Sequence, residues 1–286
     1  MAIDEITAVM RARQLVSEVN PANVPVDITS YASHVDAKIH LQSDLEPDEP
    51  GWSFENSGKY HICVSEKDSS ERQRFTICHE IAHIVLGLPS EHKSLPWWSY
   101  NTRPLSEILC DIFAAELLLP YELFKPIADN EEISFLTIDE LAERFVASIT
   151  ATGSRYAAVN IAPCAFVLSE MGKVRYTSRS LAMREVSAWI TPRTDIPKGT
   201  LSERIRNGEV TDGPYEIEAD SWFSDWTRGG VLLEDARHIS RWDQTLTLLW
   251  FEDEEVPPSI QEIDEDLMGL KELDGILPWP GRKRRK

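Results

Sequence analysis

The segment His79-Glu80-Ile81-Ala82-His83 constrains this chain more than any other feature. It lies in a stretch whose apolar residues recur at helical spacing, which predicts a helix over about 70–86. Ser70 and Gln73 form a capping-box pattern at its start, and Gly87 predicts its end. Because residues four apart share one face of a helix, His79 and His83 can bind one metal ion together.

A metal ion on this helix would have a clear chemical use. Zinc held by two histidines needs at least one further protein ligand and an open position for water, whose pKa the ion lowers. Glu80, adjacent to His79, is placed to act as general base on that water. The alternative is two surface histidines on an ordinary helix. A capped, amphipathic helix that follows a predicted strand favours the metal site.

A second apolar helix, predicted over about 104–119, supplies the candidate third ligand. Glu107 and Asp111 lie four apart on it and therefore on one face. This spacing lets one carboxylate bind metal while the other accepts a hydrogen bond from a ligand histidine. We therefore predict Glu107 as the third metal ligand and Asp111 as the residue that orients a histidine. A solvated helix edge is the alternative, which the surrounding apolar residues disfavour.

Two other ligands stay as weaker candidates. Glu116 lies on the opposite face of the second helix, and His92 lies in a proline-flanked loop. The third histidine of metzincins is absent, because Leu86 and Pro89 occupy its glycine and histidine positions. The predicted site is therefore two histidines and one glutamate. Zinc suits this set best, with manganese or iron as alternatives.

The rest of the chain predicts a mixture of helices and strands in three domains. Apolar residues such as Ile6 and Met10 indicate an amphipathic helix over 4–18, and Thr137 and Glu140 form a second capping-box pattern. Hairpins are predicted at 52–64 and 166–176, and further strands at 231–233 and 246–251. The predicted domains are 1–128, a short helical linker of helix-turn-helix proportions at 129–160, and a mixed α/β domain at 161–286.

The charge balance restricts the partners. The chain of 286 residues carries 48 acidic and 29 basic side chains, a net charge of −19, although its last five residues are all basic. Such a field opposes attraction to phosphate backbones and anionic lipids, so we expect no strong nucleic-acid binding and no membrane partner. No apolar run is long enough to span a membrane, and the four cysteines show no paired spacing. We expect a cytoplasmic protein with reduced thiols.

The two linked motifs carry a family resemblance. The segments Arg74–His83 and Glu107–Pro120 resemble those of the ImmA/IrrE-type metallopeptidases, although Cys110 stands where the family usually has alanine. The resemblance implies an α+β fold. It comprises a zincin-like domain that binds metal through His79, His83 and Glu107 with Glu80 as catalytic base, a helical linker, and a sensor-like (GAF-like) C-terminal domain. Members cut helix-turn-helix repressors in stress or mobile-element responses, which relieves repression.

We therefore expect a metal-dependent endopeptidase that acts on a repressor. The alternative is a non-proteolytic regulator that binds a repressor or toxin, with a structural or vestigial metal site. A DNA-reading protein is disfavoured, because the second linker helix offers only Arg155 as a positive group. We expect the strand at 60–64 to be an edge strand that pairs with substrate. Candidates for stabilising the oxyanion are Tyr60, His61 and Tyr100.

The tryptophans of the third domain offer no firm ligand site. They either line a pocket or fill a core. They are Trp189, Trp222, Trp226, Trp242 and Trp250.

Overall fold

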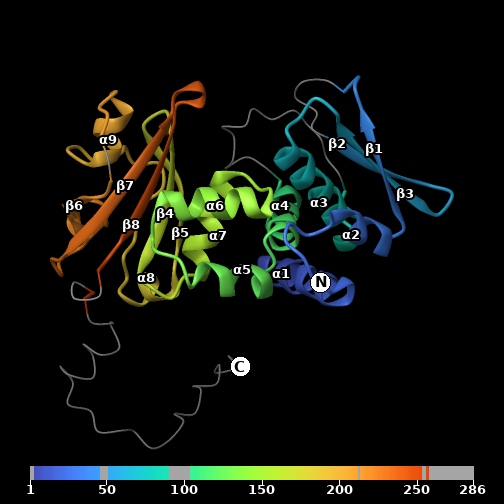
Figure 1. Ribbon diagram of the computed structural model, residues 1–286, viewed down its shortest axis with the longest axis horizontal. Helices are drawn as coiled ribbons and strands as arrows, with labels where there is room; N and C mark the ends of the chain where they lie inside the picture. Colours follow the sequence, from blue (N-terminus) through green and yellow to red (C-terminus); the bar gives the residue numbers. More distant parts are fainter. Residues whose placement is uncertain (1–2, 46–50, 90–103, 212, 253–255, 258–286) are drawn as a thin grey trace, which may run out of the picture.

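The fold consists of two β-sheets with helices between and around them (Figure 1). A computed structural model describes residues 3–45, 51–89, 104–211, 213–252 and 256–257. The chain is mixed α and β, as predicted. No described helix is long and apolar enough to cross a membrane. Of the predicted site residues, His92 and Tyr100 lie outside the described residues.

The first sheet has three strands in the order β1-β3-β2. β1 (Ala37–Gln42) runs parallel to β3 (Lys59–Ser65), and β2 (Gly51–Asn56) runs antiparallel to it. The predicted hairpin is therefore confirmed. The expectation that the strand at 60–64 is an edge strand is wrong, because β1 was not predicted and pairs with its other side. Of the two hairpin strands, β2 is the one that lies at an edge of the described sheet.

Helix α3 (Ser70–Leu86) packs on this sheet and confirms the predicted helix. Its cap differs from the prediction, because the Ser69 side chain caps the helix. The Gln73 amide instead donates to the carbonyls of Ser65, Glu66 and Asp68, and so fastens the preceding loop.

Helices α1 (Glu5–Val19), α2 (Ile28–His34) and α4 (Leu105–Leu118) complete the first region. α1 confirms the predicted helix but buries a different face. Ile6 and Met10 are 71% and 66% exposed, whereas Ala8, Ala12 and Leu15 are buried. Small alanine side chains let α1 lie close to α4, so the neighbouring helix decides which face is buried.

Three helices connect the two sheets: α5 (Tyr121–Ala128), α6 (Phe135–Phe145) and α7 (Ile149–Val159). α6 and α7 fall within the predicted linker, and their helix-turn-helix character stays a prediction. α6 is capped by Ser134, so the predicted box of Thr137 and Glu140 is wrong. α7 packs on the second sheet, where Gly153 lies so close to Phe166 that a Cβ would come within 2.3 Å of the ring.

The second sheet is entirely antiparallel, in the order β5-β4-β8-β7-β6. Its strands are β4 (Cys164–Glu170), β5 (Lys173–Arg179), β6 (Tyr215–Glu218), β7 (Val231–Ile239) and β8 (Gln244–Trp250). The predicted hairpin and both further strands are confirmed. The sequence did not predict β6, α8 (Leu181–Glu185) or α9 (Leu201–Arg206).

Apolar clusters cover both faces of the second sheet. Phe166, Leu168 and Leu248 belong to a cluster shared with α6 and α7, whereas Val167 and Leu249 belong to a second cluster on the other face. The five tryptophans do not form one pocket. Trp250 and Trp222 lie in different clusters, and Trp189 and Trp242 are about half exposed.

Candidate metal centre

Three predicted metal ligands meet where α3 and α4 pack together. The Nε2 atoms of His79 and His83 lie 3.1 Å apart. The Glu107 carboxylate, from α4, approaches both rings, with Oε2 at 3.2 Å from His79 Nε2 and Oε1 at 3.5 Å from His83 Nε2. All three residues are buried. The structure thus brings the candidate ligand atoms of α3 and α4 close together.

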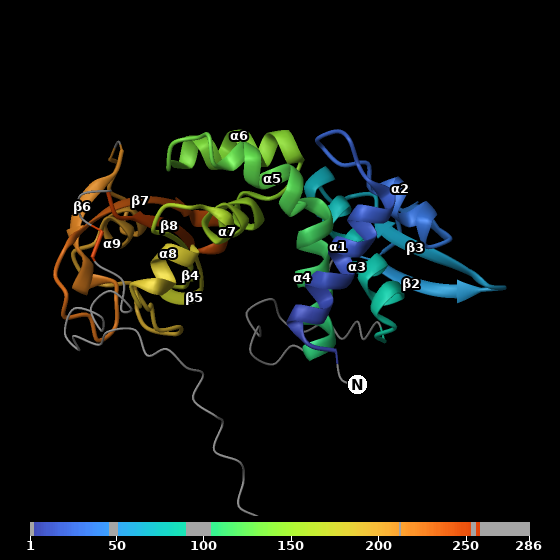
Figure 2. The same ribbon diagram turned by 90° about the horizontal axis from the view of Figure 1, so that it is seen from below.

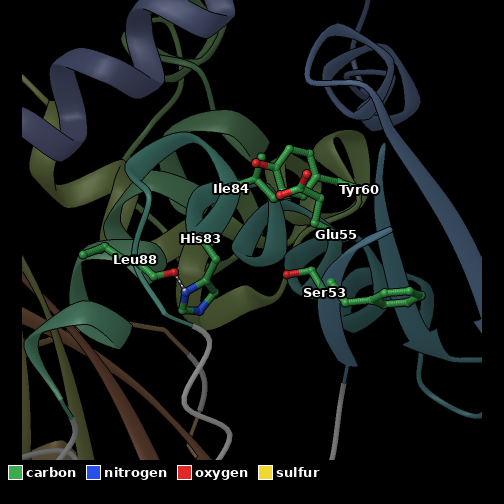
Figure 3. A pocket seen from close by; sticks show the side chains of 7 residues that line it. Ser53, Glu55, Tyr60, His83, Ile84 and Leu88 are labelled. Carbon is green, nitrogen blue, oxygen red and sulfur yellow. Dashed lines mark hydrogen bonds between the residues drawn. The ribbon is translucent and has the colours of Figure 1, made fainter. Parts of the chain in front are cut away.

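The opposite ring nitrogens are fixed by acceptors. His79 Nδ1 lies 2.9 Å from Asp111 Oδ1, and His83 Nδ1 lies 3.2 Å from the Leu88 carbonyl oxygen (Figure 3 shows the second contact). A carboxylate and a carbonyl only accept hydrogen bonds, so each Nδ1 carries the hydrogen. In the neutral rings both Nε2 lone pairs then face the same point and the Glu107 carboxylate. This donor set fits a cation.

The electrostatics of the site also favour positive charge. Burial alone would lower the pKa of His79, but hydrogen bonds to Asp111 and Glu107 raise it to about 9. Burial, and after it the positive charge of His79, lowers the pKa of His83. The carboxylates therefore stabilise one positive charge at the centre, whereas burial and the charge of His79 oppose a second proton.

Glu80 lies beside the histidines and is almost fully buried. Ligand atoms of His79, Glu80 and His83 all lie within 4.8 Å of one another. The Ser53 hydroxyl, on β2, donates a hydrogen bond of 2.6 Å to Glu80 Oε2. Sequence reasoning missed Ser53, because only the packing of β2 on α3 brings it there. A Cβ on the neighbouring Gly51 would lie 2.5 Å from Thr76 Cγ2, so glycine permits this approach.

A pocket of about 170 Å³ opens next to His83 (Figure 3). Its volume suits a single side chain rather than a large ligand. Tyr60 lines it, whereas His61 bonds to His40 at 2.9 Å and stacks on Phe54. The lining residues are Ser53, Phe54, Glu55, Tyr60, His83, Ile84 and Leu88.

Glu116 does not join the metal centre. Its buried carboxylate pairs with Arg155 of α7 at 2.8 Å and with Arg13 of α1 at 3.4 Å, and it accepts a hydrogen bond from the Tyr121 amide. It therefore ties α4 to the neighbouring helices. The suggestion that Glu116 serves as an alternative ligand is wrong.

Comparisons with known proteins agree with this geometry. Residues 33–156 match the IrrE N-terminal-like domain, Peptidase_M78. The radiation response metalloprotease IrrE of Deinococcus deserti is 33% identical over 99 residues. That alignment spans 34% of this chain and 34% of the relative, about a third of the relative's length.

A solved structure resembles most of the chain in fold alone. The structure of a Mycobacterium tuberculosis transcriptional regulator has a TM-score of 0.54 at 12% identity, over 86% of this chain and 75% of that one. The family match is more specific, because residues 33–156 include both helices of the metal centre. Residues 33–156 are therefore similar to the peptidase domain of the IrrE metalloproteases, in agreement with the resemblance that the two motifs carry.

Proposed function

We propose that the chain is a zinc-dependent endopeptidase that hydrolyses a peptide bond in a partner protein. The observation that carries the proposal is the buried meeting point of His79, His83 and Glu107, with Glu80 at its side. A purely structural zinc site is closed by a fourth protein ligand and has no use for an adjacent carboxylate.

Each residue of the centre has a proposed role. His79, His83 and Glu107 hold the ion, while Asp111 and the Leu88 carbonyl orient the two rings. Zinc at this point would polarise the scissile carbonyl and lower the pKa of a bound water. Glu80 takes the proton of the attacking water and returns it to the leaving amine. Manganese and iron are the alternative ions for the same donor set.

The structure also supports a binding mode for the substrate. β2 is one of the two edge strands of the first sheet among the described residues, and its residue Ser53 contacts Glu80, whereas β1 lies at the other edge. An extended segment that pairs with β2 would run past the metal centre and place one side chain in the pocket beside His83. The substrate is therefore proposed to bind in extended form on β2.

We extend the proposal to the identity of the substrate and to the domains. The family resemblance supports a helix-turn-helix repressor, whose cleavage would relieve repression in a stress or mobile-element response. It also supports a peptidase domain at 1–128, a helical linker at 129–160 and a sensor-like domain at 161–286.

Metal content tests the centre before any substrate is known. Elemental analysis compares the purified full chain with Glu80→Gln, Glu107→Ala and the control Glu122→Ala, an exposed position on α5. We expect about one equivalent of metal in all but Glu107→Ala. A wild-type protein that binds none of zinc, manganese or iron on titration would contradict the proposal.

Cleavage of a candidate repressor then separates the enzyme from a non-proteolytic regulator. Incubation with the wild type and with Glu80→Gln, followed by mass spectrometry, detects new termini. A peptidase loses cleavage in Glu80→Gln while retaining its metal. If Glu80→Gln instead relieves repression as well as the wild type does, the regulator interpretation replaces the enzyme.

A further inference from the structure

The region around the second sheet contains three arginines that are not paired with any described carboxylate. They are Arg179 at the end of β5, Arg184 in α8 and Arg228 in the loop before β7. Four other arginines of this region form ion pairs with a described acid, namely Arg175, Arg204, Arg206 and Arg237, whereas Arg193 and Arg241 also have no described carboxylate partner but lie outside this cluster. In a chain with a net charge of −19, three arginines gathered on one segment without such a partner call for an explanation.

One short segment brings the three arginines together. Arg179 Nη1 donates to the Ala188 carbonyl at 2.6 Å, and Arg228 Nη1 donates to the Val186 carbonyl at 2.9 Å. Arg184 precedes Val186 by two residues. Burial, and after it the positive charge of Arg184, lowers the pKa of Arg179. Two guanidinium groups are thus held on carbonyls two residues apart, with a third close by.

Tryptophan rings hold two of these groups in place. The Arg179 guanidinium lies 4.6 Å from the ring centre of Trp189, and that of Arg228 lies 5.8 Å from the ring centre of Trp226. The Trp189 carbonyl accepts a hydrogen bond of 2.8 Å from the Ser224 amide, which joins the segments that carry the two rings. Trp189 is itself 49% exposed, so part of its surface faces solvent.

One donor of the cluster has no acceptor among the described residues. The Arg228 Nη2 atom is buried and makes no hydrogen bond to any described residue. A buried donor on a charged group costs free energy unless an acceptor meets it. Guanidinium groups match the oxygen geometry of phosphate and carboxylate, and they bind phosphate strongly in pairs.

We propose that Arg179, Arg184 and Arg228 form a binding site for a small phosphate-bearing ligand. The net charge of −19 disfavours a long polyanion such as nucleic acid but not a small anion at a local basic cluster. The site is built from β5, α8 and the loop before β7, whereas the metal centre is built from α3 and α4 (Figure 1). Its test therefore does not depend on the peptidase proposal.

Calorimetric titration of the full chain with inorganic phosphate tests the site, at an ionic strength held constant with sodium chloride. We expect saturable binding that Arg184→Gln weakens by about tenfold and that the double variant with Arg179→Gln abolishes. Arg184 is exposed, so its replacement leaves the fold intact. The matched control is Arg241→Gln, because Arg241 also lies over a tryptophan, Trp242, at 5.5 Å.

A further variant distinguishes an external ligand from the chain's own carboxylates. Asp253, Glu254 and Glu255 follow Phe251, whose ring centre lies 6.1 Å from that of Trp226. The variant Asp253→Asn/Glu254→Gln/Glu255→Gln removes these charges. If phosphate binds only to this variant, or to neither protein, the proposal is wrong. It is equally wrong if Arg241→Gln weakens binding as much as Arg184→Gln does.

Discussion

The two sheets differ in what surrounds them. Figure 2 shows the two sheets in separate parts of the molecule. Edge strand β2 of the first sheet lies beside a buried group of ionisable side chains, whereas the second sheet has an apolar cluster on each face. Every residue of β4 is buried, and most of them are apolar. Under the proposed function, ionisable groups buried beside β2 would lie close to a substrate segment that pairs with this strand. The difference therefore separates residues held for chemistry from residues held for packing.

Experiments can test whether the two regions differ in this way. Around the first sheet, loss of a polar contact at the metal centre should change activity more than stability. Around the second sheet, a packing change should alter stability and leave the metal centre unchanged. Glu116 tests the boundary, because it is buried near the first sheet but contacts Arg155 of α7.

The largest expected effect is that of Glu116→Ala. It leaves Arg13 and Arg155 without their shared carboxylate, and loss of one partner of a buried ion pair costs about 3–5 kcal/mol. Urea denaturation measures the loss. The exposed control Glu122→Ala should change stability by less than about 0.5 kcal/mol. A Glu116→Ala protein that is stable but lacks metal would show that Glu116 contributes to metal binding.

Ser53→Ala should reduce activity next most strongly. Its hydroxyl donates to the Glu80 carboxylate, and a hydrogen bond to a charged group contributes about 1.5–3 kcal/mol. We therefore expect kcat to fall by about ten- to hundredfold, with KM and metal content nearly unchanged. Steady-state kinetics on a cleavable peptide measure both constants.

Two further variants show whether the Ser53 hydroxyl itself is responsible. Ser53→Thr retains a hydroxyl and should restore most of kcat. Ser57→Ala, at an exposed position of the same hairpin, should leave it unchanged. Equal activity of Ser53→Ala and the wild type would mean that Glu80 needs no partner on β2.

Gly153→Ala should destabilise the contact between α7 and the second sheet. The added methyl group would lie within 2.3 Å of the Phe166 ring, and overpacking of this kind costs about 1–3 kcal/mol. Thermal denaturation measures the effect, and metal content should not change. The double variant with Phe166→Leu should recover part of the loss. Loss of metal in the single variant would show that the two regions are coupled.

The smallest effect is a proton released when zinc binds. The pKa of His79 in the metal-free site is about 9, above its ordinary value of 6.5, so at pH 7 the folded protein holds a proton there. Zinc needs the neutral ring and should displace about one proton. Calorimetry in two buffers of different ionisation enthalpy counts it. Release should vanish well above pH 9, and its absence at pH 7 would show that His79 is already neutral.

The same shift sets the pH dependence of the metal-free protein. A raised pKa in the folded state stabilises it fully below the unfolded value of 6.5 and loses that contribution as the pH rises through about 9. Asp111→Asn removes one cause of the shift and should flatten this dependence. Denaturation of the metal-free protein between pH 6 and pH 9.5 measures it.

Much of the fold near the metal centre could be predicted from local pattern. The bounds of α3 and the β2-β3 hairpin follow from apolar spacing and from turn residues. The helix caps were harder to predict. Ser69 and Ser70 are adjacent and either could cap α3, and the Gln73 side chain finds its acceptors in the preceding loop. β1 was missed, since its pairing partner β3 comes about 20 residues later in the chain.

In the candidate site too, some residues could be predicted from the sequence and others became evident only from the structure. The sequence pointed to His79, Glu80, His83, Glu107 and Asp111, and the structure brings these side chains together. Nothing in the sequence pointed to Ser53, because a serine in a strand is common and only the structure shows that it contacts Glu80. The role of Glu116 was equally hidden, since Arg13 and Arg155 are remote from it in the sequence.

The sequence by itself determined that His79 and His83 share one helix face and that Glu107 and Asp111 share another, because residues four apart in a helix lie on the same side. Tertiary structure alone decided that β3 is a central strand and β2 an edge strand, which face of α1 is buried, and that β2 presents Ser53 to Glu80. These depend on contacts between residues far apart in the chain. Such contacts form only where the packing of whole elements offsets the entropy of closing the loops between them.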